Sequence, residues 1–326
     1  MNKALSTTAA AVALTAAAAA CGSGGGGQGG DGDGDTIVLG FSQVGAESGW
    51  RTANTESIKQ AAEEAGIELK FSDAQQQQEN QIQAIRSFIQ QDVDVIAFSP
   101  VVESGWDTVL AEARNAGIPV VLTDRAVETD QEDVYETFLG SDFVEEGRNA
   151  GRWAVEEFAD SDEDVNIVEL QGTTGSAPAI DRKEGFAEII GEDDKFEIIA
   201  SQDGEFTRAG GQEVMQAFLG SHDDIDVLYA HNDDMALGAI ESIEAAGLEP
   251  GEDIKIVSVD GIKDAFQAMA DGKINQVVEC NPLIGPQLMD LVEQVHAGEE
   301  VPERVEVEEG VFGQDQAEEE LPNREY

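Results

Sequence analysis

Carboxylates, guanidinium groups, an amide and two aromatic rings follow short apolar runs along this 326-residue sequence. The mixture suits a polyhydroxylated ring, because each hydroxyl donates to a carboxylate and accepts from an arginine or an asparagine. Aromatic rings can cover the C–H faces of such a ring, and burial of apolar surface contributes about 25 cal/mol per Å². The residues that we expect to bind the ligand are Glu47, Ser48, Gly49, Trp50, Arg51, Asp124, Arg125, Arg182, Phe206, Asn232, Asp260 and Glu279.

Structural roles compete with ligand binding at several of these positions. Asp124 and Arg125 could be a helix N-cap with a surface charge, and Arg51 could pair with a surface acid. The rings of Trp50 and Phe206 could be ordinary core residues. The ligand role is favoured because these residues follow predicted strands, and ligands bind beyond the carboxyl ends of strands in open parallel sheets.

Two further positions depend on where helices begin. Asn232, Asp233 and Asp234 precede or open a predicted helix over 234–246. We expect Asp233 or Asp234 to cap this helix, which leaves Asn232 for the ligand. Arg182 lies near the start of another predicted helix, where a positive charge opposes the helix dipole. A ligand role is therefore favoured for Arg182.

Catalysis and metal binding have little support in the sequence. The histidines are His222, His231 and His296, and none stands beside a Gly-x-Ser-x-Gly motif or in a zinc-ligand spacing. The turn after the first predicted strand lacks Gly-x-Gly-x-x-Gly, and 31–35 lacks the bidentate glutamate of an EF-hand. We therefore expect no enzymatic activity, no cofactor and no metal.

Strand-type runs alternate with helical patterns from Thr36 onward, which predicts βαβ units and an α/β fold. The strands are near-continuous Val/Ile/Leu runs, as expected when helices cover both faces of a parallel sheet. The length suits two doubly wound, Rossmann-like sheets of about five or six strands each. The predicted strands are 36–41, 67–71, 93–98, 118–122, 166–170, 196–200, 227–230, 254–259 and 274–278, with helices that include 54–65, 78–91, 105–116 and 234–246.

The charge is strongly negative: 68 acidic residues against 18 basic residues give a net charge of −50. Nucleic-acid binding requires a basic surface, so this composition excludes it. The acids are spread along the chain, which favours a solvated surface adapted to a saline habitat. The alternative is that the acidity attracts a cationic ligand.

The N-terminus has the pattern of an export signal: Lys3, an Ala-rich run over 9–20, and then Cys21. The tetrad Ala18-Ala19-Ala20-Cys21 resembles the lipobox of bacterial lipoproteins, which predicts a signal peptide over 1–20 and a lipid-modified Cys21. Residues 22–35 are nearly all Gly, Ser and Asp, which is typical of a flexible tether. The alternative is an ordinary signal peptide with an incidental cysteine. Cys280 then has no disulfide partner and is expected to be a small buried residue.

With these residues in place, the chain from Thr36 to Tyr326 resembles the ribose/galactose-type periplasmic binding proteins. Asn232-Asp233-Asp234-Met235-Ala236-Leu237-Gly238-Ala239 is similar to a motif of that family, as are Asp124-Arg125, Asp260-Gly261 and the arginine Arg182. Glu279 stands where many members have glutamine. The segment Glu47-Ser48-Gly49-Trp50-Arg51 is similar to the galactofuranose-binding members, which serve ABC transporters.

The resemblance implies the type I periplasmic binding protein fold, with three hinge crossings between two domains. The crossings are expected near Gly140, near Asn281 and near 308–310. One domain would comprise 36–139 with 281–309, and the other 140–280 with 310–326. The implied function is an exported monomer that takes a monosaccharide, galactofuranose above all, into the cleft and delivers it to an ABC transporter permease. Signalling to a membrane receptor, or another pentose or hexose, is the alternative.

A transcription regulator of the same fold would carry a helix-turn-helix before the sugar domain, where this chain has its predicted signal and tether. The expected location is the cell envelope, either lipid-anchored on the outer face of the cytoplasmic membrane or periplasmic.

Overall fold

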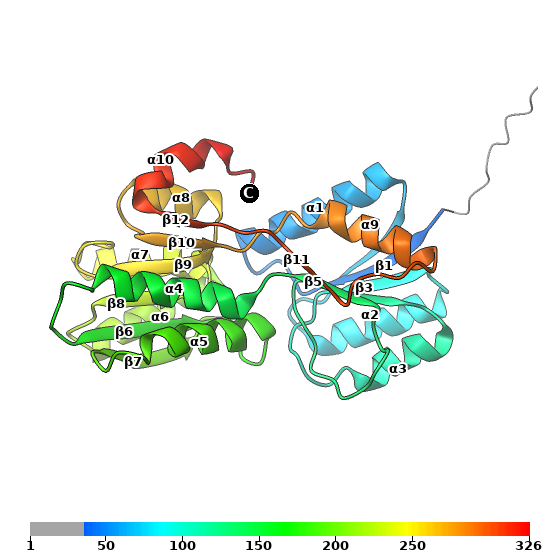
Figure 1. Cartoon of the computed structure of the whole chain (residues 1–326), viewed down its shortest axis with the longest axis horizontal. Coiled ribbons are helices and arrows are strands. Elements are labelled where there is room, and N and C mark those ends of the chain that lie inside the picture. The colour runs from blue at the N-terminus through cyan, green and yellow to red at the C-terminus, as the bar shows by residue number, and fades with distance from the viewer. Residues whose placement is uncertain (1–35) are drawn as a thin grey trace, which may run out of the picture. The chain divides into compact units, whose positions relative to one another are not determined.

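The computed structural model describes residues 36–326, which form one compact unit from Thr36 to Tyr326. The predicted signal peptide, Cys21 and the tether lie outside the described residues. Two six-stranded sheets, each flanked by helices, form two lobes of this unit (Figure 1). In residues 36–326, no helix is both long enough and apolar enough to span a membrane.

The first lobe is built mostly from the N-terminal half of the chain. Its sheet has the strand order β11-β5-β4-β3-β1-β2, and all its pairs are parallel. Its elements are β1 (Val38–Gln43), α1 (Gly49–Ala65), β2 (Glu68–Asp73), α2 (Gln78–Gln90), β3 (Val95–Phe98), α3 (Asp107–Ala116), β4 (Val120–Thr123), β5 (Thr137–Gly140), α9 (Gly285–His296) and β11 (Arg304–Glu306).

The second lobe repeats this architecture. Its sheet has the order β12-β10-β9-β8-β6-β7, and only the edge strand β12 runs antiparallel to its neighbour. Its elements are α4 (Phe143–Glu157), β6 (Val165–Gln171), α5 (Ala177–Ile190), β7 (Phe196–Asp203), α6 (Arg208–Ser221), β8 (Val227–Ala230), α7 (Asp233–Ala245), β9 (Lys255–Asp260), α8 (Lys263–Ala270), β10 (Gln276–Glu279), β12 (Val311–Gly313), α10 (Ala317–Glu320) and the short 3-10 turns η1 (Gln314–Gln316) and η2 (Leu321–Asn323).

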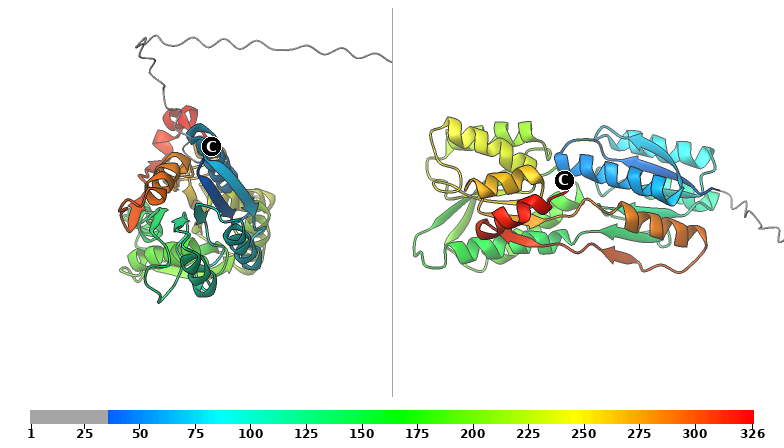
Figure 2. Two further views of the ribbon diagram at one scale, coloured as in Figure 1. Left: turned by 90° about the vertical axis from the view of Figure 1, so that its right-hand side faces the viewer. Right: turned by 90° about the horizontal axis from the view of Figure 1, so that it is seen from above.

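The chain passes between the sheets three times. It leaves β5 of the first lobe for α4, returns from β10 to α9, and leaves β11 for β12. The three connections lie side by side between the lobes (Figures 1 and 2). The predicted fold class, with two doubly wound sheets and three crossings, is confirmed.

Burial explains why these segments become strands and helices. The central strands β3, β4 and β8 are buried along their whole length, as expected for apolar runs covered by helices on both faces. Helices α1 and α3 end at Gly66 and Gly117, both in the left-handed conformation that glycine adopts without strain. The first lobe has a core cluster on each face of its sheet, and the second lobe has one continuous core.

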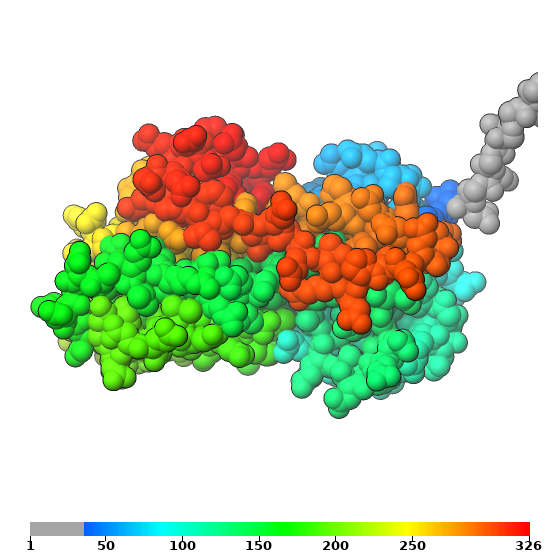
Figure 3. All heavy atoms as spheres, in the orientation of Figure 1, coloured from blue at the N-terminus to red at the C-terminus, as the bar shows by residue number. Residues whose placement is uncertain are grey.

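The C-terminal segment that includes α10 belongs to the second lobe. In the space-filling view it lies, in red, on the surface of that lobe (Figure 3). Arg324 anchors it: its guanidinium carbon lies 4.1 Å from the ring centroid of Phe266 and 4.4 Å from that of Phe312. The backbone N–H of Lys263 donates to the carbonyl of Tyr326 at 2.6 Å. The segment is therefore held by both charge and backbone contacts.

Candidate functional site

The best-defined pocket lies at the carboxyl ends of the strands, where the two lobes meet. The space between its walls, with the part open to solvent included, is about 280 Å³. Both lobes contribute to it, as expected for parallel sheets whose strand ends face one another. The lining residues are Glu47, Ser48, Trp50, Arg51, Asp124, Arg125, Pro178, Arg182, Phe206, Asn232, Asp260 and Cys280. Ten of them were predicted from the sequence, and their grouping makes the ligand role consistent with the geometry.

On the first lobe, the loop after β1, the first turn of α1 and the loop after β4 bring four charged groups together. Arg51 Nη2 lies 2.7 Å from Asp124 Oδ2, and Arg51 Nε lies 3.0 Å from Glu47 Oε1. Arg125 Nη2 lies 3.7 Å from the same Glu47 oxygen. Burial opposes ionisation of Asp124, but the charges of Arg51 and Arg125 still lower the pKa of that carboxyl group. The Asp124 carboxylate is therefore a permanent acceptor in the pocket.

Arg125 is buried, with 3% of its surface exposed. Burial and the positive charge of Arg51 lower its pKa to about 10, which still leaves it charged at neutral pH. The Nε of Arg125 has no hydrogen-bond partner among the described residues. An unpaired buried donor costs about 1–3 kcal/mol, so this N–H is available for a ligand oxygen.

On the second lobe, α5 carries Arg182 into the pocket. Arg182 Nε donates to Glu146 Oε2 at 2.6 Å, and Nη2 lies 3.9 Å from Asp260 Oδ1. Gly147 on α4 allows this approach, since a Cβ there would lie only 2.2 Å from the carbonyl oxygen of Arg182. Burial raises the pKa of Asp260 well above its ordinary value, despite the nearby Arg182 charge. Asp260 can therefore donate as well as accept a hydrogen bond in the pocket.

Two aromatic rings wall the pocket. Trp50 is the second residue of α1 in the first lobe, yet it packs with the core cluster of the second lobe. Its Nε1 donates to the carbonyl of Cys280 at 2.6 Å. Phe206 comes from the loop between β7 and α6 and is 4% exposed. Both rings therefore belong to the core of the second lobe and also line the pocket.

Three of the lining residues have positive φ angles, which non-glycine residues rarely adopt. They are Asp124 (φ 60°), Phe206 (φ 59°) and Asp260 (φ 130°). Such conformations cost of order 1–3 kcal/mol each and cluster at functional sites. This backbone strain supports a binding role for the pocket.

Two predicted residues lie elsewhere. The Glu279 carboxylate turns away from the pocket: Oε1 pairs with Arg324 and accepts from the Tyr326 hydroxyl at 3.2 Å, and Oε2 accepts from Gly310 N at 2.9 Å. Gly49 does not line the pocket, and its N–H donates to Asp234 Oδ2 of the other lobe at 2.7 Å. Glu279 therefore anchors the C-terminal segment, and Gly49 makes a contact between the lobes.

The expected cap of α7 was wrong. Asn232 is the N-cap, and its Oδ1 accepts from Met235 N at 3.0 Å. Asp233 instead accepts from Gly261 N and Ile262 N, so it holds the turn that follows Asp260. Asn232 also lines the pocket, because capping uses its oxygen while the residue stays at the strand end. Its Nδ2 donates to the carbonyl of Phe206 at 3.1 Å and so supports that turn.

Pro178 and Cys280 line the pocket without having been predicted to do so. Cys280 is 1% exposed, so the expectation of a small buried residue is correct but incomplete. The missed signal is the end of β10, which lies at Glu279 and makes Cys280 the residue that follows the strand. Pro178 is in the first turn of α5, which the sequence placed near the site only through Arg182.

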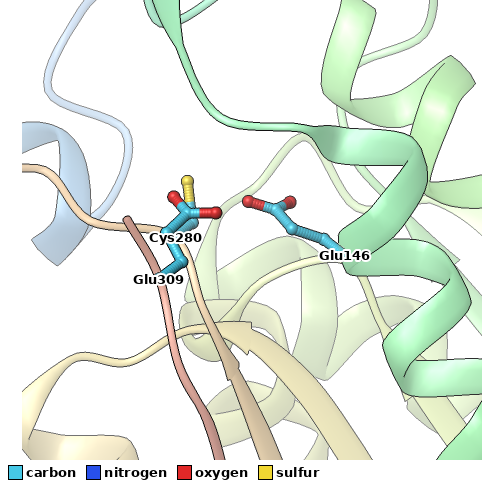
Figure 4. A group of neighbouring side chains, drawn as sticks. All are labelled: Glu146, Cys280 and Glu309. Atoms are coloured by element: carbon cyan, nitrogen blue, oxygen red, sulfur yellow. The ribbon is translucent and has the colours of Figure 1, made fainter. Parts of the chain in front are cut away.

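Behind the pocket, Glu146, Cys280 and Glu309 offer ligand atoms within 4.8 Å of one another (Figure 4). The carboxyl group of Glu309 accepts from Ser141 Oγ and from Asn281 N, so it joins all three crossings. Burial and the charge of Glu146 raise the pKa of Glu309 to about 9. Glu146 is already paired with Arg182, whose positive charge disfavours a cation here. The group is therefore better suited to hold a proton than a metal ion.

His231 is the one histidine close to the pocket among the described residues, and its side chain is fully buried behind it. Its Nε2 lies 3.1 Å from Glu169 Oε1, and Gly172 N donates toward Nδ1 at 3.4 Å. Burial lowers the pKa of His231, which keeps the imidazole neutral. Its contacts are structural, and His231 is absent from the pocket lining.

Two α/β lobes, three connections and a polar pocket between the lobes define a bilobal ligand-binding protein. The sequence profile described as the periplasmic binding protein domain matches residues 39–300, and the chain belongs to this family. The chain is 45% identical to the galactofuranose-binding protein YtfQ of Escherichia coli K12 over 292 residues. This match covers 88% of this chain and 91% of that protein.

Solved structures of sugar-bound proteins are also similar to this chain. A Mycobacterium smegmatis protein in complex with β-D-fucofuranose is 65% identical, with a TM-score of 0.88 and coverage of 89% of this chain and 96% of that one. The binding protein of the arabinose ABC transporter from Shewanella sp. ANA-3, bound to α- and β-L-arabinofuranose, is 47% identical. Its TM-score is 0.85, with coverage of 89% and 96%.

Proposed function

We propose that this protein captures a monosaccharide in its five-membered furanose ring form and delivers it to an ABC transporter. The observation that carries the proposal is the pocket itself, where three guanidinium groups and three carboxyl groups face the space between the lobes. This balance suits a neutral polyol better than a cationic ligand, so the acidic composition is not explained by the site. The names of the relatives supply the ring form, and galactofuranose is the proposed sugar.

The proposed ligand-binding residues are the ten predicted residues that line the pocket. The carboxylates of Glu47 and Asp124 accept from sugar hydroxyls, and Arg125 and Arg182 donate to ring or hydroxyl oxygens. The rings of Trp50 and Phe206 cover the C–H faces. We propose that the two domains that close around the sugar comprise residues 36–139 with 281–309, and residues 140–280 with 310–326.

A binding experiment with isotopically labelled sugar tests both the ligand class and the ring form. D-Galactose labelled with ¹³C at C1 is titrated into the protein, and calorimetry follows the heat. The C1 resonance of the bound sugar is then recorded, since furanose and pyranose anomeric carbons have distinct chemical shifts. The proposal expects saturable binding with a furanose signal. A pyranose signal would show that the protein binds the six-membered ring and would contradict the proposed ring form. If galactose, arabinose, fructose and ribose all fail to bind, the proposal of a sugar ligand is wrong.

We further propose that Cys21 carries the lipid anchor and that the protein is an exported monomer without enzymatic activity. The support is the signal-like N-terminus with its Ala-Ala-Ala-Cys sequence and the tether over 22–35. Mass spectrometry of the mature N-terminus tests the anchor: the expected product begins with a diacylated Cys21. A Cys21→Ser variant should be released from membranes, and retention of that variant would contradict the anchor.

A further inference from the structure

The carboxylate of Asp234 belongs to the second lobe but contacts the first turn of a helix in the first lobe. Its Oδ2 accepts from the backbone N–H of Gly49 at 2.7 Å, and Gly49 is the first residue of α1. Asp234 itself is the second residue of α7 and is 7% exposed. The bond is therefore a largely buried, charge-assisted contact between the lobes, and such bonds are about twice as strong as neutral ones.

At the start of α1, the one nearby carboxylate that the described residues of its own lobe supply just before the cap is that of Glu47, which is paired with the side chain of Arg51 and lies close to Arg125. Ser48 caps the helix by accepting from Arg51 N at 3.0 Å, but the first turn holds no acidic residue. The partial positive charge of a helix N-terminus is stabilised by a carboxylate. In this structure that carboxylate comes from Asp234, across the gap between the lobes. The favourable interaction is present only when the lobes are close.

The surroundings of Asp234 keep its side chain in place. Oδ1 accepts from Arg208 Nε at 3.2 Å, and Arg208 Nη2 also bonds Asp264 on α8 at 3.2 Å. A methyl group built on Gly49 would lie 3.5 Å from Ile262 Cδ1, so the start of α1 packs against the second lobe. Asp234 does not line the pocket, although it follows the pocket residue Asn232 by two positions.

We propose that Asp234 is a positioning residue that stabilises the closed arrangement of the lobes and thereby raises sugar affinity without touching the sugar. A residue that favours the closed state increases the fraction of protein competent to hold the ligand. Its loss should therefore weaken binding chiefly through faster release. This inference rests on the proposed sugar-binding function.

Two substitutions remove the two halves of the contact. Asp234→Ala removes the acceptor. Gly49→Pro removes the donor N–H and keeps the helix, because proline is favoured at the first helical position and Ser48 already has the extended conformation that must precede it (φ −142°, ψ 165°). Asp264→Ala is the matched control, since it removes the other partner of Arg208 without a contact to the first lobe.

The test measures the unliganded protein by small-angle scattering and the binding of D-galactose by stopped-flow and calorimetry. We expect Asp234→Ala and Gly49→Pro to enlarge the radius of gyration without sugar and to raise the dissociation rate and Kd about tenfold. The double variant should be no worse than either single one. Asp264→Ala should behave as the wild type, and thermal unfolding reports any separate cost of losing Asp234 from α7.

Unchanged scattering and affinity in Asp234→Ala, or an equal effect of Asp264→Ala, would overturn the inference. An additive double variant would do the same, because it would show two independent effects. The scattering arm requires no sugar. If it responds as expected while the wild type binds none of the sugars, the closing role of Asp234 stands and the proposed function fails.

Discussion

The Arg125 guanidinium group of the first lobe lies over the Phe206 ring of the second lobe, with 5.3 Å between the guanidinium carbon and the ring centroid. The Arg182 guanidinium group lies near the same ring at 6.0 Å. A desolvated cation–π contact contributes about 2 kcal/mol or more. The ring of Phe206 thus serves both as a wall of the pocket and as a contact between the lobes.

Replacing Arg125 should reveal this double role. We expect Arg125→Ala to raise the sugar Kd at least about 100-fold, because it leaves the buried Glu47 and Asp124 carboxylates short of a positive partner. The Kd of Arg125→Lys should lie between those of the wild type and Arg125→Ala, since lysine keeps the charge but not the planar guanidinium group. Calorimetry checks both, with the exposed Arg114→Ala as the control. An Arg125→Ala protein with wild-type affinity would remove Arg125 from the site.

Gly172 should be intolerant of any side chain, since a Cβ there would lie 1.8 Å from Phe206 Cζ. Gly172→Ala must therefore push the Phe206 ring out of position, and we expect Kd to rise about tenfold or more. Gly220→Ala is the matched control, because a Cβ there meets nothing within 4 Å and alanine is the better helix former. Equal affinities of the two variants would show that the ring position does not matter for binding.

Most of the longer strands were predictable because a strand that is buried on both faces consists of a continuous run of apolar residues. The central strand β8 was found with its bounds unchanged, at Val227–Ala230. Three short strands were missed: β5, which is buried but has only four residues, and the edge strands β11 and β12, which have three residues each and are defined by their pairing with β5 and β10. Such strands depend on contacts that lie far away in the chain, and local sequence carries little of that information.

The errors in the site come from element boundaries displaced by one residue. Strand β10 ends at Glu279 and not at Val278, so the residue after the strand is Cys280. Helix α7 begins at Asp233 and not at Asp234, so Asn232 becomes the cap. A one-residue shift in a strand reverses the face that a side chain occupies, which is why Glu279 points to the C-terminal segment.

This corrected role of Glu279 leads to a stability prediction. We expect Glu279→Gln to lower the free energy of unfolding by about 1–3 kcal/mol, because it removes the charge that Arg324 pairs with. The sugar Kd should change by less than about threefold, since the carboxylate lies outside the pocket. Urea unfolding and calorimetry measure the two quantities. Arg324→Ala should destabilise similarly, and the double variant should cost less than the sum. A large loss of affinity at unchanged stability would restore Glu279 to the ligand site.

The protonated Glu309 at the three crossings predicts a pH dependence of stability. Its pKa in the folded protein is raised to about 9, against about 4.3 for an exposed glutamate. Across that window the folded state keeps a proton that the unfolded state releases, so the free energy of unfolding falls as pH rises toward about 9. Glu309→Gln removes this contribution. Glu146, Cys280 and Arg182 face the same cluster and remain in both proteins.

Urea unfolding at about pH 5.5 and about pH 8.5 checks the prediction, because both values lie inside the window. The wild type should lose more stability between the two than Glu309→Gln does. Glu303→Gln, at an exposed position of the same segment, should follow the wild type. If Glu309→Gln loses as much stability as the wild type, Glu309 is ionised in the folded protein and the prediction is wrong.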